Sequence, residues 1–296
     1  MSPFVIMLIL ISTFMHAGWN LLARSQRREA TFFWRMLLAV IVVGLLPAGV
    51  SEFITRSLTP KAWVCVSISG VFAGVYMFAL ARAYGESDFT VVYPVARALP
   101  VVLVGVADML RSRCPTTLGW VGMTTVVAGC MLAPLHSFRD FAFRRYANRT
   151  IVWILVAALT TVGFTMFDKV AAEDIRQSYA TAARYAFTLY IFWWLTYSVL
   201  LWLFKAPEEG EEDPGWILPV LGGLCTYGSY SLVVWAYQLA PHASYIVAFR
   251  QFSIVLGVAA AFVLYRERGL AVRLAGTLLI TAGLVLIALF GGEATP

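Results

Sequence analysis

The chain consists almost entirely of long apolar stretches, and these constrain its fold more than any other feature. A helix that crosses the hydrocarbon core of a bilayer needs about 20 mainly apolar residues. Ten stretches of this kind follow one another: 3–23, 30–50, 62–83, 89–110, 116–136, 151–171, 179–204, 215–239, 242–264 and 270–290. Membrane β-strands would be about 10 residues long and would alternate in polarity. The stretches therefore predict an all-α integral membrane protein with ten transmembrane helices.

The composition agrees with this class and argues against several others. Hydrophobic residues make up 60% of the 296 residues and charged residues only 13%, so little chain remains for a soluble domain. The formal net charge of +6 comes mostly from cations at span ends, which is typical of a membrane protein and not of a nucleic-acid-binding one. The sequence contains no CxxC, HExxH or GxSxG motif and no nucleotide-binding loop. We therefore expect no metal, no cofactor and no enzymatic activity.

Two arginines lie deep inside apolar spans, at matching positions in the two halves of the chain. Arg97 is in the fourth span and Arg250 in the ninth. Tyr84 precedes the first arginine and Tyr237 the second by the same interval, since 250 − 97 = 237 − 84 = 153. An arginine near the bilayer midplane costs roughly 3 kcal/mol on insertion scales. The duplicated placement therefore favours a functional site. A structural alternative, in which backbone carbonyls of the helices satisfy each guanidinium, stays open.

The internal match extends to the last span of each half. Gly122 and Gly129 correspond to Gly276 and Gly283 at an offset of 154 residues. Each half has five spans, and because this number is odd, the second copy would enter the membrane upside down. Inverted repeats are typical of secondary transporters, whose sites lie near the midplane between the repeats. The predicted organisation is a first repeat at 1–137, a linker at 138–150 and a second repeat at 151–296.

Lysines and arginines are more frequent in the odd-numbered loops than in the even-numbered ones. The positive-inside rule places the odd-numbered loops in the cytoplasm and both termini on the opposite side. The first stretch lacks a basic n-region, so we interpret it as a retained span and not as a cleaved signal peptide. We expect a multi-pass protein of the cytoplasmic (inner) membrane of a prokaryote, as a monomer or a homodimer.

Further polar residues and prolines surround the arginine positions. Pro94 and Pro100 flank Arg97 and predict a distorted fourth helix, because proline removes a backbone donor. Tyr93 precedes Arg97 by four residues and shares its face. Gln251 directly follows the arginine of the ninth span.

Spans one and three supply three more candidates. His16 and Asn20 lie on one stripe of the first span, and a histidine at this depth can relay a proton or bind a substrate. A neutral imidazole bonded to a neighbouring helix is the structural alternative. Tyr76 belongs to a stripe on the third span that packing would also explain. If His16 relays a proton, transport would be coupled to protons.

Three segments carry a resemblance to a known family. They are His16-Ala-Gly-Trp-Asn20, Val92-Tyr93-Pro94-Val-Ala-Arg97 and Ala248-Phe-Arg250-Gln251. Together with the ten-span, two-repeat layout, they resemble the EamA-type branch of the drug/metabolite transporter superfamily. The resemblance implies a basket in which spans 1–4 and 6–9 surround a central cavity and spans 5 and 10 lie outside it. Gln251 departs from the family pattern, which often has an acidic residue there.

The sign of the deep charges bears on the substrate. The deep positions hold two arginines and no recognisable carboxylate, since we interpret Asp108 and Asp168 as interfacial. Small multidrug exporters of the superfamily hold organic cations with an intramembrane glutamate, and the first span has none. Arginine instead grips a carboxylate, phosphate or phosphonate.

We therefore expect a secondary transporter that moves a small anionic or zwitterionic organic metabolite by alternating access. The predicted substrate-binding residues are Arg97, Arg250, Tyr93, His16, Asn20, Tyr76 and Gln251. A flippase for a lipid-linked phosphate or headgroup is the alternative that uses the same arginines, and it would need a lateral opening for the lipid tail.

Overall fold

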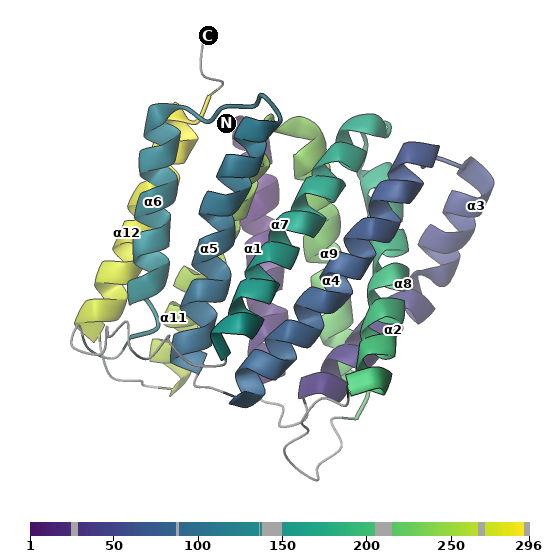
Figure 1. The fold of residues 1–296 in the computed structure, drawn as a ribbon, viewed down its shortest axis with the longest axis horizontal. Coiled ribbons are helices and arrows are strands. Elements are labelled where there is room, and N and C mark those ends of the chain that lie inside the picture. Colours follow the sequence, from purple (N-terminus) through teal and green to yellow (C-terminus); the bar gives the residue numbers. More distant parts are fainter. Residues whose placement is uncertain are drawn as a thin grey trace.

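The computed structural model describes residues 1–24, 29–86, 89–135, 137, 150–204, 215–265 and 270–292, and residues 138–149 of the predicted linker lie outside this part of the chain. It consists of helices joined by short connections (Figure 1). They are α1 (Pro3–Arg24), α2 (Glu29–Gly44), η1 (Leu45–Val50), α3 (Ser51–Thr55), α4 (Pro60–Glu86), α5 (Phe89–Leu110), α6 (Thr117–Leu132), α7 (Thr150–Asp174), α8 (Tyr179–Phe204), α9 (Ile217–Leu239), α10 (Ala243–Arg250), α11 (Phe252–Tyr265) and α12 (Leu270–Phe290).

The lengths and composition of these helices confirm the prediction of an all-α membrane protein. Within the described residues, eight helical segments are long and apolar enough to cross a membrane. Helix α6 is a shorter apolar helix of 16 residues, and α5 adds a further helix of 22 residues. These segments follow the ten stretches read from the sequence.

Two spans depart from regular helix. The second span continues beyond its predicted end at residue 50, through the π-helical η1, which contains Pro47, into α3. The ninth span is interrupted at Gln251, whose backbone N–H donates to the Ala248 carbonyl oxygen at 3.0 Å, one residue closer than in an α-helix. By contrast, α5 passes through Pro94 and Pro100 without interruption. The break in helical structure lies beside Arg250 and not in the span that contains the prolines.

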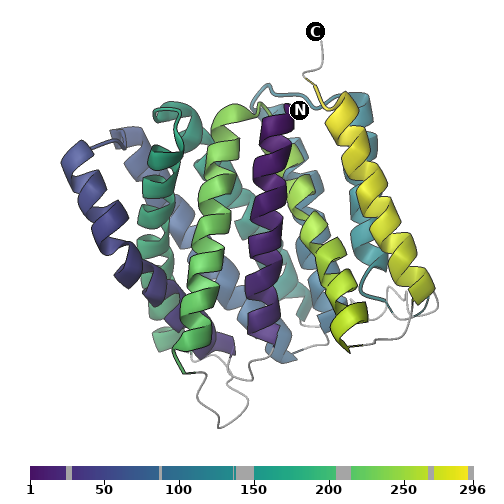
Figure 2. The same cartoon turned by 180° about the vertical axis from the view of Figure 1, so that it is seen from behind.

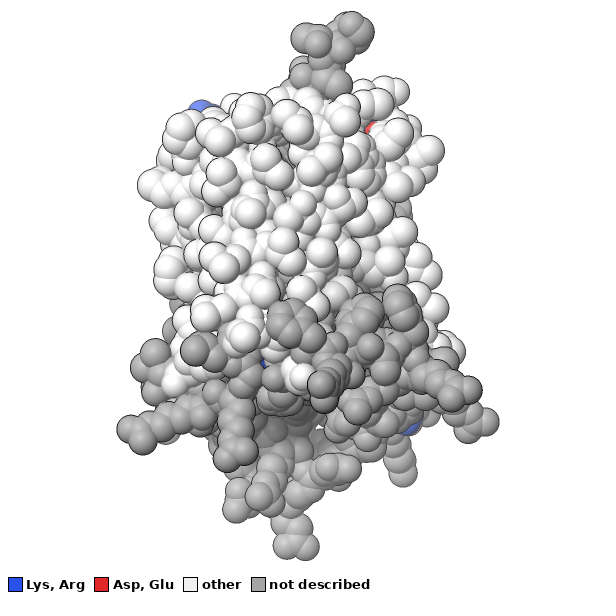
Figure 3. All heavy atoms as spheres, turned by 90° about the vertical axis from the view of Figure 1, so that its left-hand side faces the viewer, with Lys and Arg blue, Asp and Glu red and all other residues white. Residues whose placement is uncertain are grey.

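The helices stand side by side with α1 in the middle of one face, where it packs against α9 and α11 (Figure 2). On the opposite face, α4 packs against α7 and α8 (Figure 1). Helices α6 and α12 pair at one edge, where the described residues in the middle of the surface are uncharged (Figure 3). The Met1 ammonium donates to the Ala288 carbonyl oxygen at 3.3 Å, so the first residue and the end of α12 lie together.

The pairing of α6 with α12 depends on glycines that allow the two backbones to approach closely. A Cβ atom on Gly129 would lie 2.6 Å from the Gly276 carbonyl oxygen, and one on Gly122 would lie 2.8 Å from the Gly283 carbonyl oxygen. The order of these contacts makes the two helices antiparallel. Small residues drive helix association in membranes because they permit this close van der Waals contact.

We expect the Gly129→Ala variant to be less stable than the unmodified protein by about 1–3 kcal/mol, because the added methyl group would collide with backbone atoms of α12. Thermal unfolding in detergent measures the effect. Gly257→Ala in α11 is the matched control, since a Cβ atom there meets nothing within 4 Å. Both variants gain the same helix propensity. Equal unfolding temperatures for the two variants would contradict this account of the contact.

Candidate functional site

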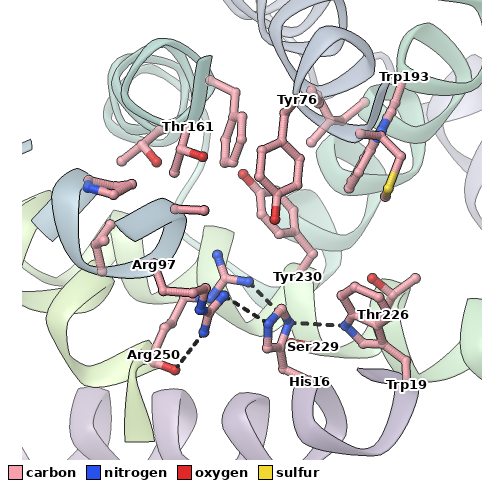
Figure 4. Close-up of a pocket in the computed structure, with 18 of the residues that line it drawn as sticks. His16, Trp19, Tyr76, Arg97, Thr161, Trp193, Thr226, Ser229, Tyr230 and Arg250 are labelled. Atoms are coloured by element: carbon pink, nitrogen blue, oxygen red, sulfur yellow. Dashed lines mark hydrogen bonds between the residues drawn. The ribbon is translucent and has the colours of Figure 1, made fainter. Parts of the chain in front are cut away.

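A cavity lies at the centre of the bundle, between helices of both halves of the chain (Figure 4). The cavity volume is about 60 Å³, which suits a small ligand. Its lining residues are His16, Trp19, Ala73, Tyr76, Met77, Ala96, Arg97, Pro100, Thr161, Phe164, Thr165, Leu189, Trp193, Thr226, Ser229, Tyr230, Val247, Arg250 and Gln251.

The side chain of Arg97 reaches from α5 to the interrupted ninth span. Its Nη2 donates to the Ser253 hydroxyl at 2.8 Å and to the Arg250 carbonyl oxygen at 3.3 Å. That carbonyl is available because the Ile254 N–H donates to the carbonyl oxygen of Gln251 at the helix break. A helix end leaves backbone acceptors that a neighbouring cation can use. The break therefore helps to hold Arg97 beside Arg250.

The His16 ring lies beside both guanidinium groups, with the Trp19 indole on its other side (Figure 4). Its Nε2 is 3.1 Å from Nη1 of Arg97, and its Nδ1 is 3.4 Å from Nη2 of Arg250. The indole N–H of Trp19 also donates to Nδ1, at 3.0 Å. Guanidinium and indole groups can only donate, whereas a neutral imidazole has a single acceptor nitrogen. Three donor groups thus surround an imidazole with one acceptor nitrogen, and a ligand with several acceptor oxygens suits such a cluster.

A second interaction connects Arg250 with a buried acid. Its guanidinium carbon lies 5.7 Å from the centre of the Tyr230 ring, a cation–π geometry. The Tyr230 hydroxyl donates to Asp168, which is fully buried. Asp168 also accepts hydrogen bonds from Ser69 at 2.5 Å and from Tyr185 at 2.7 Å.

The sequence analysis interpreted Asp168 and Asp108 as interfacial, and the structure shows that both side chains are 0% exposed. Hydroxyl groups from three neighbouring helices hold Asp168 inside, and the backbone N–H of Ser244 donates to Asp108 at 2.8 Å. The lining of the cavity itself nevertheless includes two arginines and no carboxylate among the described residues.

Lys169, the neighbour of Asp168 in the chain, is directed elsewhere. Its ammonium group donates to the carbonyl oxygens of Tyr237 at 2.7 Å and of Ala240 at 2.5 Å, at the C-terminal end of α9. It also pairs with Glu173 at 3.0 Å. A cation at this position complements the helix dipole. Lys169 thus fixes α7 to α9 outside the cavity.

The structure brings together most of the predicted site residues. Arg97, Arg250, His16, Tyr76, Gln251 and Pro100 all line the cavity. The side chain of Asn20 does not line it and donates to the His16 carbonyl oxygen at 2.7 Å. The side chains of Tyr93 and Pro94 lie outside the described residues.

The sequence analysis did not select the hydroxyl-bearing residues of α7 and α9. Thr161, Thr165 and Asp168 follow one another at intervals of four and three residues, which places them on one face of α7. Thr226 and Ser229 have the same relation on α9. This spacing was a signal in the sequence, but hydroxyl groups in spans also bond to their own helix.

Gln251 offers the cavity an acceptor in addition to these hydroxyls. Its Nε2 donates to the Val247 carbonyl oxygen at 2.9 Å, while its buried Oε1 has no hydrogen-bond partner among the described residues. No group of three or more His, Cys, Asp and Glu side chains in the described part of the chain is placed to hold a metal ion.

We expect His16→Leu to lower the free energy of unfolding by about 1–3 kcal/mol, because the Trp19 indole and the Arg250 guanidinium lose Nδ1, the acceptor that they share. His16→Gln, which keeps an acceptor oxygen, is expected to lose less. Thermal unfolding in detergent, without added ligand, measures both variants. If the leucine variant were as stable as the glutamine variant, the acceptor role of His16 would be refuted.

Comparison with known proteins shows what the chain is similar to. Residues 3–134 match the EamA-like transporter family. A solved structure whose description reads "Crystal structure of protein" has a similar fold, with a TM-score of 0.74 over 98% of each chain and 15% sequence identity. At this identity the likeness concerns the fold alone. A search of curated proteins found no match.

Proposed function

We propose that the chain is a secondary transporter for a small anionic or zwitterionic organic metabolite, and the match of residues 3–134 to the EamA-like transporter family supports this proposal. The candidate classes are carboxylates, amino acids and phosphonates. The observation that carries the proposal is the convergence of Arg97 and Arg250 on one ring in a central cavity.

The charge and the geometry of this cluster favour an oxyanion. Guanidinium groups bind carboxylates and phosphonates through paired, charge-assisted hydrogen bonds. The interior of a helical bundle has a lower effective dielectric constant than water, so the attraction between opposite charges is stronger there. An oxyanion between Arg97 and Arg250 would accept hydrogen bonds from both guanidinium groups.

Other lining groups suit the rest of a small zwitterion. The Oε1 atom of Gln251 and the hydroxyls of Thr226 and Ser229 are acceptors for an ammonium group. Aromatic rings of Tyr76 and Trp193 supply apolar surface. Pockets for small molecules commonly combine an apolar lining with a few polar groups that fix orientation.

Alternating access between two inverted repeats is the mechanism that we propose. The antiparallel contacts of α6 and α12 support it, because Gly129 meets Gly276 while Gly122 meets Gly283. In the repeat, Gly122 corresponds to Gly276 and Gly129 to Gly283, whereas in space Gly122 contacts Gly283 and Gly129 contacts Gly276. A two-fold axis between the repeats produces this crossed pairing. We assign residues 1–137 and 151–296 to the repeats, and the intervening residues to the linker.

Substrate binding would directly weaken hydrogen bonds between the two halves of the chain. Arg97 of the first half donates to Ser253 and to the backbone of Arg250 in the second half. An anion that takes up the Arg97 guanidinium competes with these contacts between the halves. A ligand shifts a conformational equilibrium when it binds one state better than another, and this competition supplies such a difference.

Ligand-dependent thermal stabilisation of the purified protein tests the substrate class. We expect an L-amino acid, a small organic acid or methylphosphonate to raise the unfolding temperature, because ligand binding stabilises the folded state. Tetraalkylammonium ions of similar size are the control of opposite charge. Stabilisation only by the cations would contradict the proposal, and stabilisation only by a polyprenyl phosphate would instead identify a flippase.

Arg97→Ala and Arg250→Ala are each expected to weaken binding of the stabilising anion by roughly 10- to 100-fold, since a hydrogen bond to a charged group contributes about 1.5–3 kcal/mol. Uptake of that compound into proteoliposomes should fall accordingly. Arg35→Ala is the matched control, because this arginine donates to the Gly215 carbonyl oxygen at 2.8 Å and does not line the cavity. Full transport by both cavity variants would contradict the assignment.

A further inference from the structure

A buried carboxylate next to the cavity is linked to it through one tyrosine. Asp168 is 0% exposed and accepts hydrogen bonds from Ser69 of α4, Tyr185 of α8 and Tyr230 of α9. Tyr230 is the member of this group that lines the cavity, where its ring faces the guanidinium of Arg250. Asp168 is thus one residue removed from the proposed anion site.

The polar, charged and titratable groups around Asp168 lie on five helices, α4, α7, α8, α9 and α10. They are Cys65 and Ser69 on α4, Tyr185 on α8, Tyr230 and Tyr237 on α9, Arg250 on α10, and Lys169 on its own helix. Lys169 bonds to carbonyl oxygens of α9 and to Glu173. Three hydroxyl donors stabilise the ionised carboxylate, and the positive charge of Arg250, whose guanidinium faces the Tyr230 ring, adds to them. One of the groups that stabilise the ionised carboxylate therefore also faces the cavity.

Ser69 allows the aspartate to be satisfied in two protonation states. Its hydroxyl lies 2.5 Å from Oδ1 of Asp168 and 3.4 Å from the Phe164 carbonyl oxygen. When the aspartate is ionised, the serine donates to it. When Oδ1 carries a proton, that O–H can donate to the serine oxygen, and the serine hydrogen can turn to the carbonyl of Phe164.

The two tyrosines do not oppose either state. A protonated Oδ1 still accepts from Tyr185, and Oδ2 still accepts from Tyr230. The polar atoms of the carboxyl group therefore keep partners in both states, as buried polar groups require. A site that served only to anchor a permanent carboxylate would not need a second acceptor behind the serine.

We propose that Asp168 binds a proton when an anionic substrate binds to the arginines, which makes it the proton site of a coupled transporter. The inference rests on the proposed function. An anion on Arg250 offsets the positive charge that stabilises the ionised carboxylate, so an O–H bond forms on Oδ1 with a proton taken from water. A substrate with one negative charge then enters together with one positive charge. By linkage, protonation of Asp168 favours anion binding to the same extent.

Infrared difference spectroscopy of the full chain in detergent tests the site. We expect a protonated-carboxyl band that is lost in Asp168→Asn and that grows when methylphosphonate is added. In Arg250→Gln, without any ligand, the band should already be larger, because the stabilising cation is gone. Absence of a band that depends on Asp168, or a band unchanged by Arg250→Gln, would overturn the proposal.

The same measurement separates this inference from the substrate assignment. A band that responds to Arg250→Gln but not to any anion would support the proton site and overturn the substrate class. Anion binding without any change in the band would overturn the proton site alone. The dependence of methylphosphonate affinity on pH, measured by thermal stabilisation, should be reduced in Asp168→Asn if that variant folds.

A serine variant distinguishes proton binding from a structural role. Ser69→Ala keeps both tyrosine donors for the carboxylate but removes the serine donor of its ionised form and the acceptor of its protonated form. The bond to the ionised form is charge-assisted and the stronger of the two, so the band should become larger. Ser67→Ala on the same helix is the matched control, because its hydroxyl donates to the Trp63 carbonyl oxygen at 2.8 Å. Equal bands in the two serine variants would exclude the exchange of hydrogen bonds described above.

Discussion

Holding two guanidinium groups against one imidazole inside an apolar bundle is the constraint on which the rest of the site depends. Like charges at short range repel each other, and burial removes the water that would screen them. Groups on separate helices surround the two guanidiniums: the His16 ring, the Ser253 hydroxyl and the backbone carbonyl of Arg250, which the break at Gln251 leaves available. The Tyr230 ring adds a polarisable face beneath Arg250. The interrupted ninth span and the packing of α1 beside it follow from this need.

The sequence was sufficient to predict the helical membrane fold and to select the two arginines, because both follow from the free-energy cost of placing polar or charged groups in hydrocarbon. Long apolar runs have few alternatives to spanning helices, and an intramembrane arginine is rarely incidental. The environment of Asp168 could not be predicted in this way. Its place near the end of a span suits an interfacial residue, and only the hydroxyls from α4, α8 and α9 determine that it is buried. Those partners are distant in the chain.

Asn20 and the prolines show a similar limit of local reasoning. Asn20 shares a stripe with His16, but its amide bonds to a carbonyl of its own helix and does not enter the cavity. This local competition is common for short polar side chains. The prolines of α5 suggested a distorted span, yet the interruption occurs beside Arg250, where no proline is present. No proline or glycine lies within five residues of Gln251, so the sequence carries no local mark of this break.

The glycine contacts between α6 and α12 limit how the two halves of this chain can diverge. When large side chains pack together, an increase in one can be matched by a decrease in the other. Here both partners are already glycine, and at each of the four glycines a backbone atom of the facing segment would lie within 2.8 Å of an added Cβ atom. No smaller residue exists, so a compensating substitution is not available. Selection at these positions should therefore act on the pair as a unit, even though neither helix contributes a residue to the lining of the cavity.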